Sequence, residues 1–153
     1  MSIKYLKGDL LTQITTYPSY ILHSCNCQGS WGGGFAYQLS KRYPQATKIY
    51  QDHCRSFKGK DLVGKSTVIP SDDGKFQIIC LFTSYGSGGT HDDPDTIVNN
   101  TRSALKDLRG KVPQGALISM PLINSGIFMV PWADTEDVLK MYEDLWSFDV
   151  YVL

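Results

Sequence analysis

Two glycine-containing segments carry the residue types best suited to hold a ligand. Residues 23–35 read HSCNCQGSWGGGF and overlap the end of Tyr20–Cys25, a mostly apolar stretch with the length of a buried strand. The three adjacent glycines fall where a helix is expected to begin, so free backbone amides could approach a bound group closely there. Residues 124–129 (NSGIFM) follow a second apolar stretch and could form another nest of amides.

Neither segment contains a lysine or an arginine, so a phosphate held there would depend on backbone amides. The first segment lacks the GK[ST] ending of a P-loop, and GGGFAY does not fit the GxGxxG pattern of dinucleotide-binding folds. One such loop alone would be interpreted as a tight turn. Two of them, each at the end of a strand, make diphosphate binding an equal alternative.

Two of the three histidines are candidates for proton transfer, because an imidazole with a pKa of about 6.5 can donate or accept a proton near neutral pH. His23 ends a strand at the first loop, and His91 lies in the glycine-rich segment 84–93 beside two aspartates, which suits a general acid. Each has a structural alternative, a buried strand histidine and a solvent-exposed loop histidine. His53 lies beside the apolar face of a helix and is expected to be structural.

The four cysteines, Cys25, Cys27, Cys54 and Cys80, have neither paired CxxC spacing nor a matching histidine spacing. We therefore expect no metal site and reduced thiols. The sequence also lacks the CX5R loop, the DxDx(T/V) pair and the His/Asp ladder of familiar phosphatases.

The elements that would position these residues alternate between strands and helices. The patterns predict strands at 3–6, 20–25, 66–69, 76–83, 116–123 and 148–153, of which the third and fourth form a hairpin. They also predict four helices. The first spans 34–42, and the second has an apolar face made by Ala46, Ile49, Tyr50, Cys54 and Phe57. The third follows an N-cap at Asp93, and the fourth follows an N-cap at Asp134 and has an inner face of Val138, Met141, Tyr142, Leu145 and Trp146. This alternation predicts an α/β fold with a mixed sheet, covered on both faces, and a ligand beyond the carboxyl ends of the strands.

Composition limits the class of protein further. The 153 residues are 42% hydrophobic, and 15 Lys+Arg balance 15 Asp+Glu, which suits one domain, residues 1–153, and a monomer. Without a basic stretch, direct binding to nucleic acid or to a membrane surface is not expected. The apolar stretches are too short to span a bilayer, and the start MSIKYLKGDL has no signal-peptide character, so we expect a cytoplasmic or nuclear protein.

At this level of detail the sequence resembles the macrodomain family, a three-layer α/β/α fold with a central mixed sheet that binds ADP-ribose. The resemblance rests on KGDLL at residues 7–11, on HSCNCQGSWGGGFAYQL at 23–39 and on INSGIFMVPW at 123–132. Within the family it is most similar to the fungal ADP-ribose 1″-phosphate phosphatases, which share the SWGGG and AYQL segments and end in a Val-Tyr-x-Leu strand, here residues 150–153.

The resemblance assigns roles to individual residues. It implies that Asp9, with Gly8 and Leu10, binds adenine, which Tyr151 could also contact, and that Asn26 holds the distal ribose. The remaining binding residues would be Ser24, Cys25, Trp31, Gly32, Gly33, Gly34, Phe35 and Ala36 from the first segment, and Asn124, Ser125, Gly126, Ile127, Phe128 and Met129 from the second. As alternatives, Gly8-Asp9 is a turn, Asn26 fixes the loop, and Phe128 and Tyr151 are core aromatics, which for Tyr151 is the favoured interpretation.

The implied reaction removes the terminal phosphate of ADP-ribose 1″-phosphate, a small-molecule by-product of tRNA splicing, without a cofactor and with His23, Asn26 and His91 as the catalytic candidates. The sequence departs from other branches of the family. Ala36 and Tyr37 replace the aspartate of the common esterase route, and Phe128 replaces the aspartate of the lysine-and-aspartate branch. The alternatives are a hydrolase that releases mono-ADP-ribose from ADP-ribosylated proteins, a non-catalytic reader of such proteins, and a generic nucleotide binder.

Overall fold

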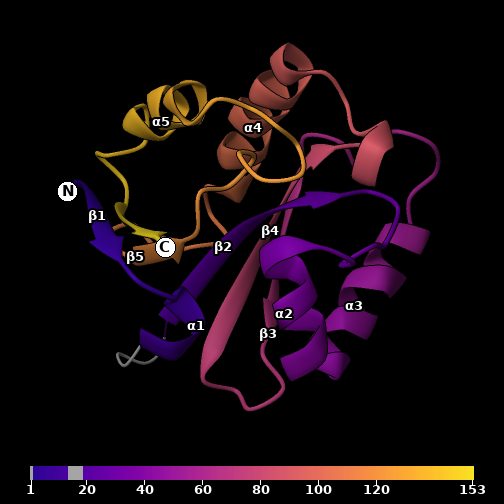
Figure 1. Ribbon diagram of the computed structural model, residues 1–153, viewed down its shortest axis with the longest axis horizontal. Coiled ribbons are helices and arrows are strands. Elements are labelled where there is room, and N and C mark those ends of the chain that lie inside the picture. Colours follow the sequence, from indigo (N-terminus) through magenta and orange to yellow (C-terminus); the bar gives the residue numbers. More distant parts are fainter. Residues whose placement is uncertain (1, 14–18) are drawn as a thin grey trace.

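The computed structural model describes residues 2–13 and 19–153, and a six-stranded mixed sheet organises them (Figure 1). The strand order is β1-β6-β5-β2-β4-β3; every neighbouring pair is parallel except β3 and β4, which are antiparallel. The strands are β1 Ile3–Lys7, β2 Ser19–Asn26, β3 Ser66–Pro70, β4 Phe76–Ser84, β5 Leu117–Met120 and β6 Ser147–Val152.

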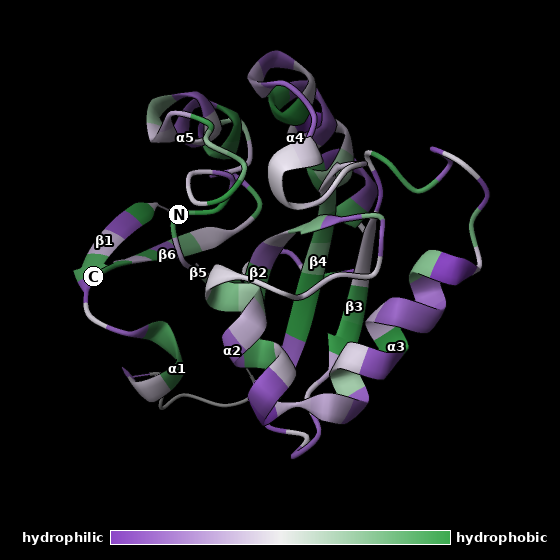
Figure 2. Cartoon of the chain, turned by 45° about the vertical axis from the view of Figure 1, so that its right-hand side comes forward, coloured by the Kyte–Doolittle hydropathy of each residue, from purple (hydrophilic) through white to green (hydrophobic). Residues whose placement is uncertain are grey.

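Helices cover both faces of this sheet and enclose two hydrophobic cores. On one face pack α1 Leu10–Gln13, α2 Gly34–Arg42 and α3 Pro44–Arg55. On the other pack α4 Pro94–Leu108 and α5 Trp132–Lys140. Figure 2 shows why the helices cover the sheet: β4 is mainly hydrophobic, whereas the helices combine hydrophobic and hydrophilic residues, so each helix buries one side only. The predicted three-layer α/β/α fold is confirmed.

Local signals in the sequence account for several boundaries. Helix α2 spans the predicted residues, and α4 starts with Pro94 after the predicted N-cap Asp93, whose carboxylate accepts a hydrogen bond from the Thr96 amide at 2.8 Å. The hairpin of β3 and β4 also forms as predicted.

Other predictions of the elements were wrong. Helix α5 begins at Trp132, directly after Pro131, so Asp134 lies inside the first turn and makes no cap. The helix ends at Lys140, which leaves Met141 62% exposed, and Ile49 on α3 is 44% exposed. Strand β5 ends at Met120 because Pro121 has no amide hydrogen for the ladder. The short α1 was not predicted.

The arrangement brings five chain segments to one edge. Since β1, β6, β5, β2 and β4 run parallel, their carboxyl ends lie along the same side of the sheet, and the segments that follow them converge there. The helices of the described ranges 2–13 and 19–153 include none with the length and hydrophobicity to cross a membrane.

Candidate active site

A cavity of about 670 Å³ opens at this edge, a volume suited to a small-molecule ligand. It lies between the segments after β1, β2, β4 and β5 and the end of β6. Of the residues predicted from the sequence, it is lined by Gly8, Asp9, Leu10, His23, Ser24, Cys25, Asn26, Trp31, Gly32, Gly33, Gly34, Phe35, Ala36, Asn124, Gly126, Ile127, Phe128 and Tyr151.

Three predicted residues do not line the cavity. The Ser125 hydroxyl turns back to donate to the Val130 carbonyl at 2.8 Å, and Met129 is 72% exposed. His91 lies behind Phe128, with 6.0 Å between the ring centroids. In turn, Ser87 and Gly88 line the cavity although sequence reasoning missed them. The glycine-rich segment 84–93 could have predicted these two lining residues, but only its histidine was considered a candidate.

The first loop, residues 27–33, is closed by the amide group of Asn26. Its Nδ2 donates to the Ser30 carbonyl at 2.8 Å, and its Oδ1 accepts from the amides of Gln28 and Ser30 at 3.0 and 3.2 Å. Tyr50 of α3 donates to the same Oδ1 at 3.0 Å. Burial raises the pKa of Tyr50, which keeps the phenol protonated as a donor. Both Nδ2 and Oδ1 of Asn26 are therefore used in hydrogen bonds that shape the loop.

Trp31 fixes the middle of this loop against the core. It is 4% exposed and stacks on Tyr50 with 4.6 Å between centroids, while its other neighbour, His23, meets it edge-on at 5.0 Å. The loop beyond it thus enters α2 from a rigid base. In the described ranges, the amides of Gly34, Phe35 and Ala36 in the first turn of α2 have no protein acceptor, so they are available to an anion in the cavity.

The second loop, residues 124–130, begins at Asn124, which is 2% exposed and has the left-handed φ of 64° that asparagine tolerates. Its amide nitrogen donates to the Ser24 hydroxyl of β2 at 3.0 Å, and its carbonyl accepts from Val130 at 2.9 Å. Within the part of the chain that the structure describes, the amides of residues 126–128 have no protein acceptor. This loop therefore offers a second row of free amides.

The two loops approach each other across the cavity at one point. A Cβ placed on Gly33 would lie 2.4 Å from Cδ1 of Ile127, so the Ile127 side chain reaches across only because residue 33 is a glycine. Ile127 itself is 48% exposed and lines the cavity. Together the loops form a bridge with free amides on both sides.

Among the described residues, the cavity lining contains no lysine or arginine side chain, and Asp9 supplies its one carboxylate side chain. One Asp9 oxygen, Oδ1, accepts from the Leu11 amide at 3.1 Å at the start of α1. Tyr151 lines the same region and also packs on the core; burial, with a further contribution from Asp149, raises its pKa. An anionic ligand is thus met by neutral amides at one end and by an acceptor at the other.

His91 is oriented by its own loop, residues 85–93. Its Nδ1 lies 2.7 Å from the Asp92 carbonyl, which makes Nδ1 the protonated nitrogen and leaves Nε2 available. The Asp92 carboxylate accepts from the Tyr85 amide at 2.9 Å, and the Asp92 amide donates to the Ser84 hydroxyl at 2.9 Å. These bonds tie the loop that carries Ser87 and Gly88 at the cavity wall.

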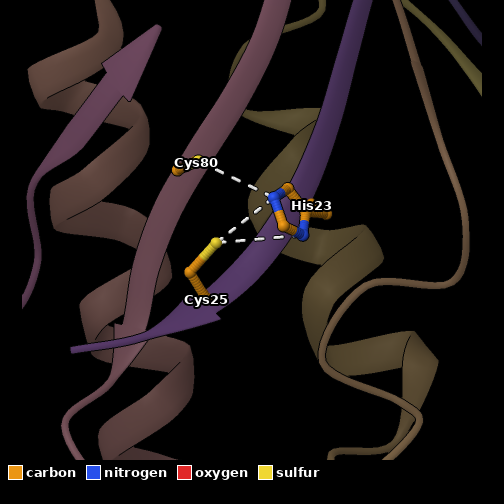
Figure 3. A group of neighbouring side chains, drawn as sticks. All are labelled: His23, Cys25 and Cys80. Carbon is orange, nitrogen blue, oxygen red and sulfur yellow. Dashed lines mark hydrogen bonds between the residues drawn. The ribbon is translucent and has the colours of Figure 1, made fainter. Parts of the chain in front are cut away.

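His23 has a different environment, in which its ring faces two thiols (Figure 3). Nε2 lies 3.3 Å from Sγ of Cys25 and 3.7 Å from Sγ of Cys80. Burial, followed by the neighbouring Cys80, raises the pKa of Cys25, so that thiol is protonated at neutral pH. Among the described residues, these three form the group with metal-ligand geometry.

This fold and site define a class of protein. The Macro domain family model matches residues 22–139, and the chain belongs to that family. The macrodomain of Mycobacterium tuberculosis DarG superposes with a TM-score of 0.72 at 21% identity, covering 99% of this chain and 97% of that one.

Relatives with higher identity carry one common name, ADP-ribose 1″-phosphate phosphatase. The chain is 40% identical to the protein of that name from Saccharomyces cerevisiae strain YJM789 in an alignment that covers 99% of both chains. It is 41% identical to the Candida glabrata protein of that name, again with 99% of both chains covered.

Proposed function

We propose that the protein is an ADP-ribose 1″-phosphate phosphatase, which converts its substrate into ADP-ribose and inorganic phosphate. The observation that carries the proposal is the cavity between the two amide-bearing loops, in a chain that aligns over 99% of its length with phosphatases of that name.

In this proposal the substrate lies along the cavity with its diphosphate under the bridge between Gly33 and Ile127. Free amides from the first turn of α2 and from residues 126–128 face it from two sides, and each neutral donor stabilises the anion without a lysine or arginine. The adenine amino group lies at the opposite end, at the Asp9 carboxylate, because a carboxylate accepts hydrogen bonds only. The distal ribose lies between Asn26 and Phe128.

Hydrolysis needs a water molecule in line with the scissile bond, donors for the phosphoryl oxygens and a proton for the departing sugar oxygen. The water oxygen forms a bond to phosphorus while the bond from phosphorus to the 1″ oxygen breaks. Loop amides serve as donors, and Asn26 acts as a positioning residue through the loop that it closes.

His91 is the proton carrier in this proposal. Its Nδ1 is engaged by a carbonyl, so Nε2 can hold the proton that the departing 1″ oxygen receives. The loop that carries it reaches the cavity wall through Ser87 and Gly88. In this proposal the loop shifts when substrate binds, so that the imidazole passes Phe128 and reaches the distal ribose. His23 fits this role less well, because its ring faces two thiols and is 2% exposed.

The test of the activity is phosphate release from ADP-ribose 1″-phosphate by the purified protein. We expect turnover, with ADP-ribose as the second product. Binding of ADP-ribose without any phosphate release contradicts the proposal and favours a reader of ADP-ribosylated proteins. Release of labelled ADP-ribose from a modified protein, with no action on the phosphate ester, favours the protein hydrolase.

The test of the proton carrier is the variant His91→Gln. We expect kcat to fall by about a hundredfold or more, the usual contribution of general acid catalysis, with little change in ADP-ribose affinity. Asp95→Asn, at an exposed position outside this loop and outside the cavity lining, is the control and keeps full activity. Full activity in His91→Gln would remove this residue from the mechanism while leaving the phosphatase proposal intact.

A further inference from the structure

Three side chains that are common metal ligands meet below the first loop, and the proposed reaction uses none of them. His23 and Cys25 lie two residues apart on the same face of β2, and Cys80 lies directly across from His23 on β4 (Figure 3). All three are buried, with exposed fractions of 2%, 2% and 0%. Since His23 and Cys25 also line the cavity, the group lies directly behind the cavity wall.

The three ligand atoms are close enough together to share one small ion. The three atoms lie within 4.8 Å of one another, and Nε2 of His23 is 3.3 and 3.7 Å from the two sulfurs. Tetrahedral zinc, with Zn–N of about 2.0 Å and Zn–S of about 2.3 Å, places nitrogen and sulfur ligands about 3.5 Å apart. The two separations lie on either side of this value. Because Sγ of Cys25 is also 3.8 Å from Nδ1, this sulfur lies beside the imidazole ring, and the Cys25 side chain must turn toward the front of Nε2 to share an ion with it.

We propose that this group is a zinc site, with Nε2 of His23 and the sulfurs of Cys25 and Cys80 as ligands. Thiolate and imidazole ligands suit Zn²⁺, whereas carboxylate and carbonyl oxygens suit calcium and magnesium. Binding displaces one proton from each thiol to solvent, and the two thiolates then balance the charge of the ion. The buried group therefore carries no net charge after binding, which limits the cost of placing an ion there.

Three protein ligands leave one position of a tetrahedral ion open. The cavity wall formed by His23 and Cys25 places that position within reach of a water molecule or a small anion. The ion would also join β2 to β4 below Trp31, which packs on the His23 ring.

A disulfide between Cys25 and Cys80 is the main alternative use of the two thiols, and the strand register opposes it. Cys80 is paired with His23, so Cys25 lies two residues further along the neighbouring strand. A step of two residues and one strand spacing separates the Cα atoms by about 8 Å, beyond the upper limit of about 6.8 Å for a disulfide. A metal ion reaches both sulfurs without moving the backbone.

Cobalt(II) is the probe for this site, because a thiolate ligand gives it an intense charge-transfer absorption. We expect the reduced, chelator-treated protein to bind one Co²⁺ per chain with that absorption, to release two protons per ion, and to lose the band when Zn²⁺ is added. Azide is expected to shift the visible bands by taking the open position. Absence of a thiolate band at stoichiometric Co²⁺ overturns the site, and bands unchanged by azide overturn the open position.

Variants assign the ligands. Cys80→Ser and His23→Gln are expected to abolish the thiolate band or the stoichiometric binding, whereas Cys54→Ala, the matched control at a buried cysteine outside the group, keeps both. Far-UV circular dichroism and ADP-ribose titration show whether each variant is folded. A band that survives in Cys80→Ser and disappears in Cys54→Ala overturns the ligand assignment. All of these readouts are independent of phosphatase activity.

Discussion

The two loops that face each other across the cavity are each anchored by a buried asparagine, but the two side chains point in opposite directions. Asn26 turns into its own loop and binds the backbone of Gln28 and Ser30. Asn124 turns away from its loop, and its side chain bonds to the hydroxyls of Thr83, Thr101 and Thr135, on β4, α4 and α5 respectively, at 2.9, 3.0 and 3.3 Å.

The difference shows that the side chain of Asn26 shapes its loop mainly through neighbouring residues, whereas the side chain of Asn124 holds its loop through distant parts of the fold. The Asn26 side chain closes the first loop through bonds to residues two and four positions away and accepts one bond from the distant Tyr50. The loop is also held from outside, because the Cys27 amide and Nε2 of Gln28 donate to the Tyr85 carbonyl and Nε2 of Gln51 donates to the Gly29 carbonyl. The second loop depends on three other elements being in place before it can form. We therefore expect damage at Asn124 to lower the stability of the whole fold and damage at Asn26 to affect the ligand site more selectively.

Asn124→Ala is expected to have the largest effect, a loss of about 3 kcal/mol in the free energy of unfolding. It leaves buried hydroxyls without their partner and places alanine at a left-handed φ. Urea denaturation measures the change. Ser125→Ala, which removes one bond to the Val130 carbonyl, is the control at about 1 kcal/mol. A smaller loss for Asn124→Ala than for Asn26→Ala would reverse the comparison.

Asn26→Ala is expected to lower stability by about 2 kcal/mol and ADP-ribose affinity by about tenfold, because the first loop loses its internal bonds. Denaturation and calorimetric titration measure the two effects. Asn26→Asp keeps the acceptor for the Gln28 and Ser30 amides but places a carboxylate oxygen against the Ser30 carbonyl, so it should recover only part of the loss. Equal losses in both variants would show that the acceptor bonds do not shape the loop.

Gly33→Ala is expected to weaken ADP-ribose binding by about 1 kcal/mol, because the new Cβ forces Ile127 from its place over the cavity. In an Ile127→Ala background the same change should cost much less, since the clash is gone. Gly89→Ala, at a glycine outside the cavity lining with open space around the Cβ, is the control. Additive effects in the double variant would show that the two loops do not meet as described.

The smallest expected effect is a change with pH in the free energy of unfolding, and it arises near the first loop. His53 lies on α3, the helix that also carries Tyr50, and its ring packs on Phe82. Burial, together with Lys111, lowers the pKa of His53. The folded state thus binds this proton less readily than the unfolded chain, whose histidine pKa is about 6.5. His53 favours the folded state above that pH, and this contribution falls as pH drops toward the lower folded pKa.

Denaturation of the wild type and of His53→Gln at pH 7.5 and at pH 5.5 measures this contribution. The variant should lose less stability than the wild type between the two conditions. An identical loss in both proteins would mean that His53 does not titrate differently in the folded state.

Much of the fold and of the cavity could be predicted from the sequence. Asp93-Pro94 and the three glycines before α2 are local signals, and a helix or a turn follows from them wherever they occur. Asp134 and Met141 failed as predictions because the start and the end of α5 depend on Pro131 and on where the chain must turn toward β6. The sequence could not show whether His91 or Ser87 lines the cavity, because the hydrogen bonds of Asp92 within the loop decide which of them reaches the cavity wall.

The sequence by itself determined the alternation of strands and helices and the two glycine-containing loops, because these depend on residues close along the chain. Tertiary structure alone decided which distant side chains meet. The group of His23, Cys25 and Cys80 has no spacing that marks it in the sequence, since its members come together only through the register of two parallel strands joined by a long connection. Asn124 likewise has a role only once β4, α4 and α5 have packed around it.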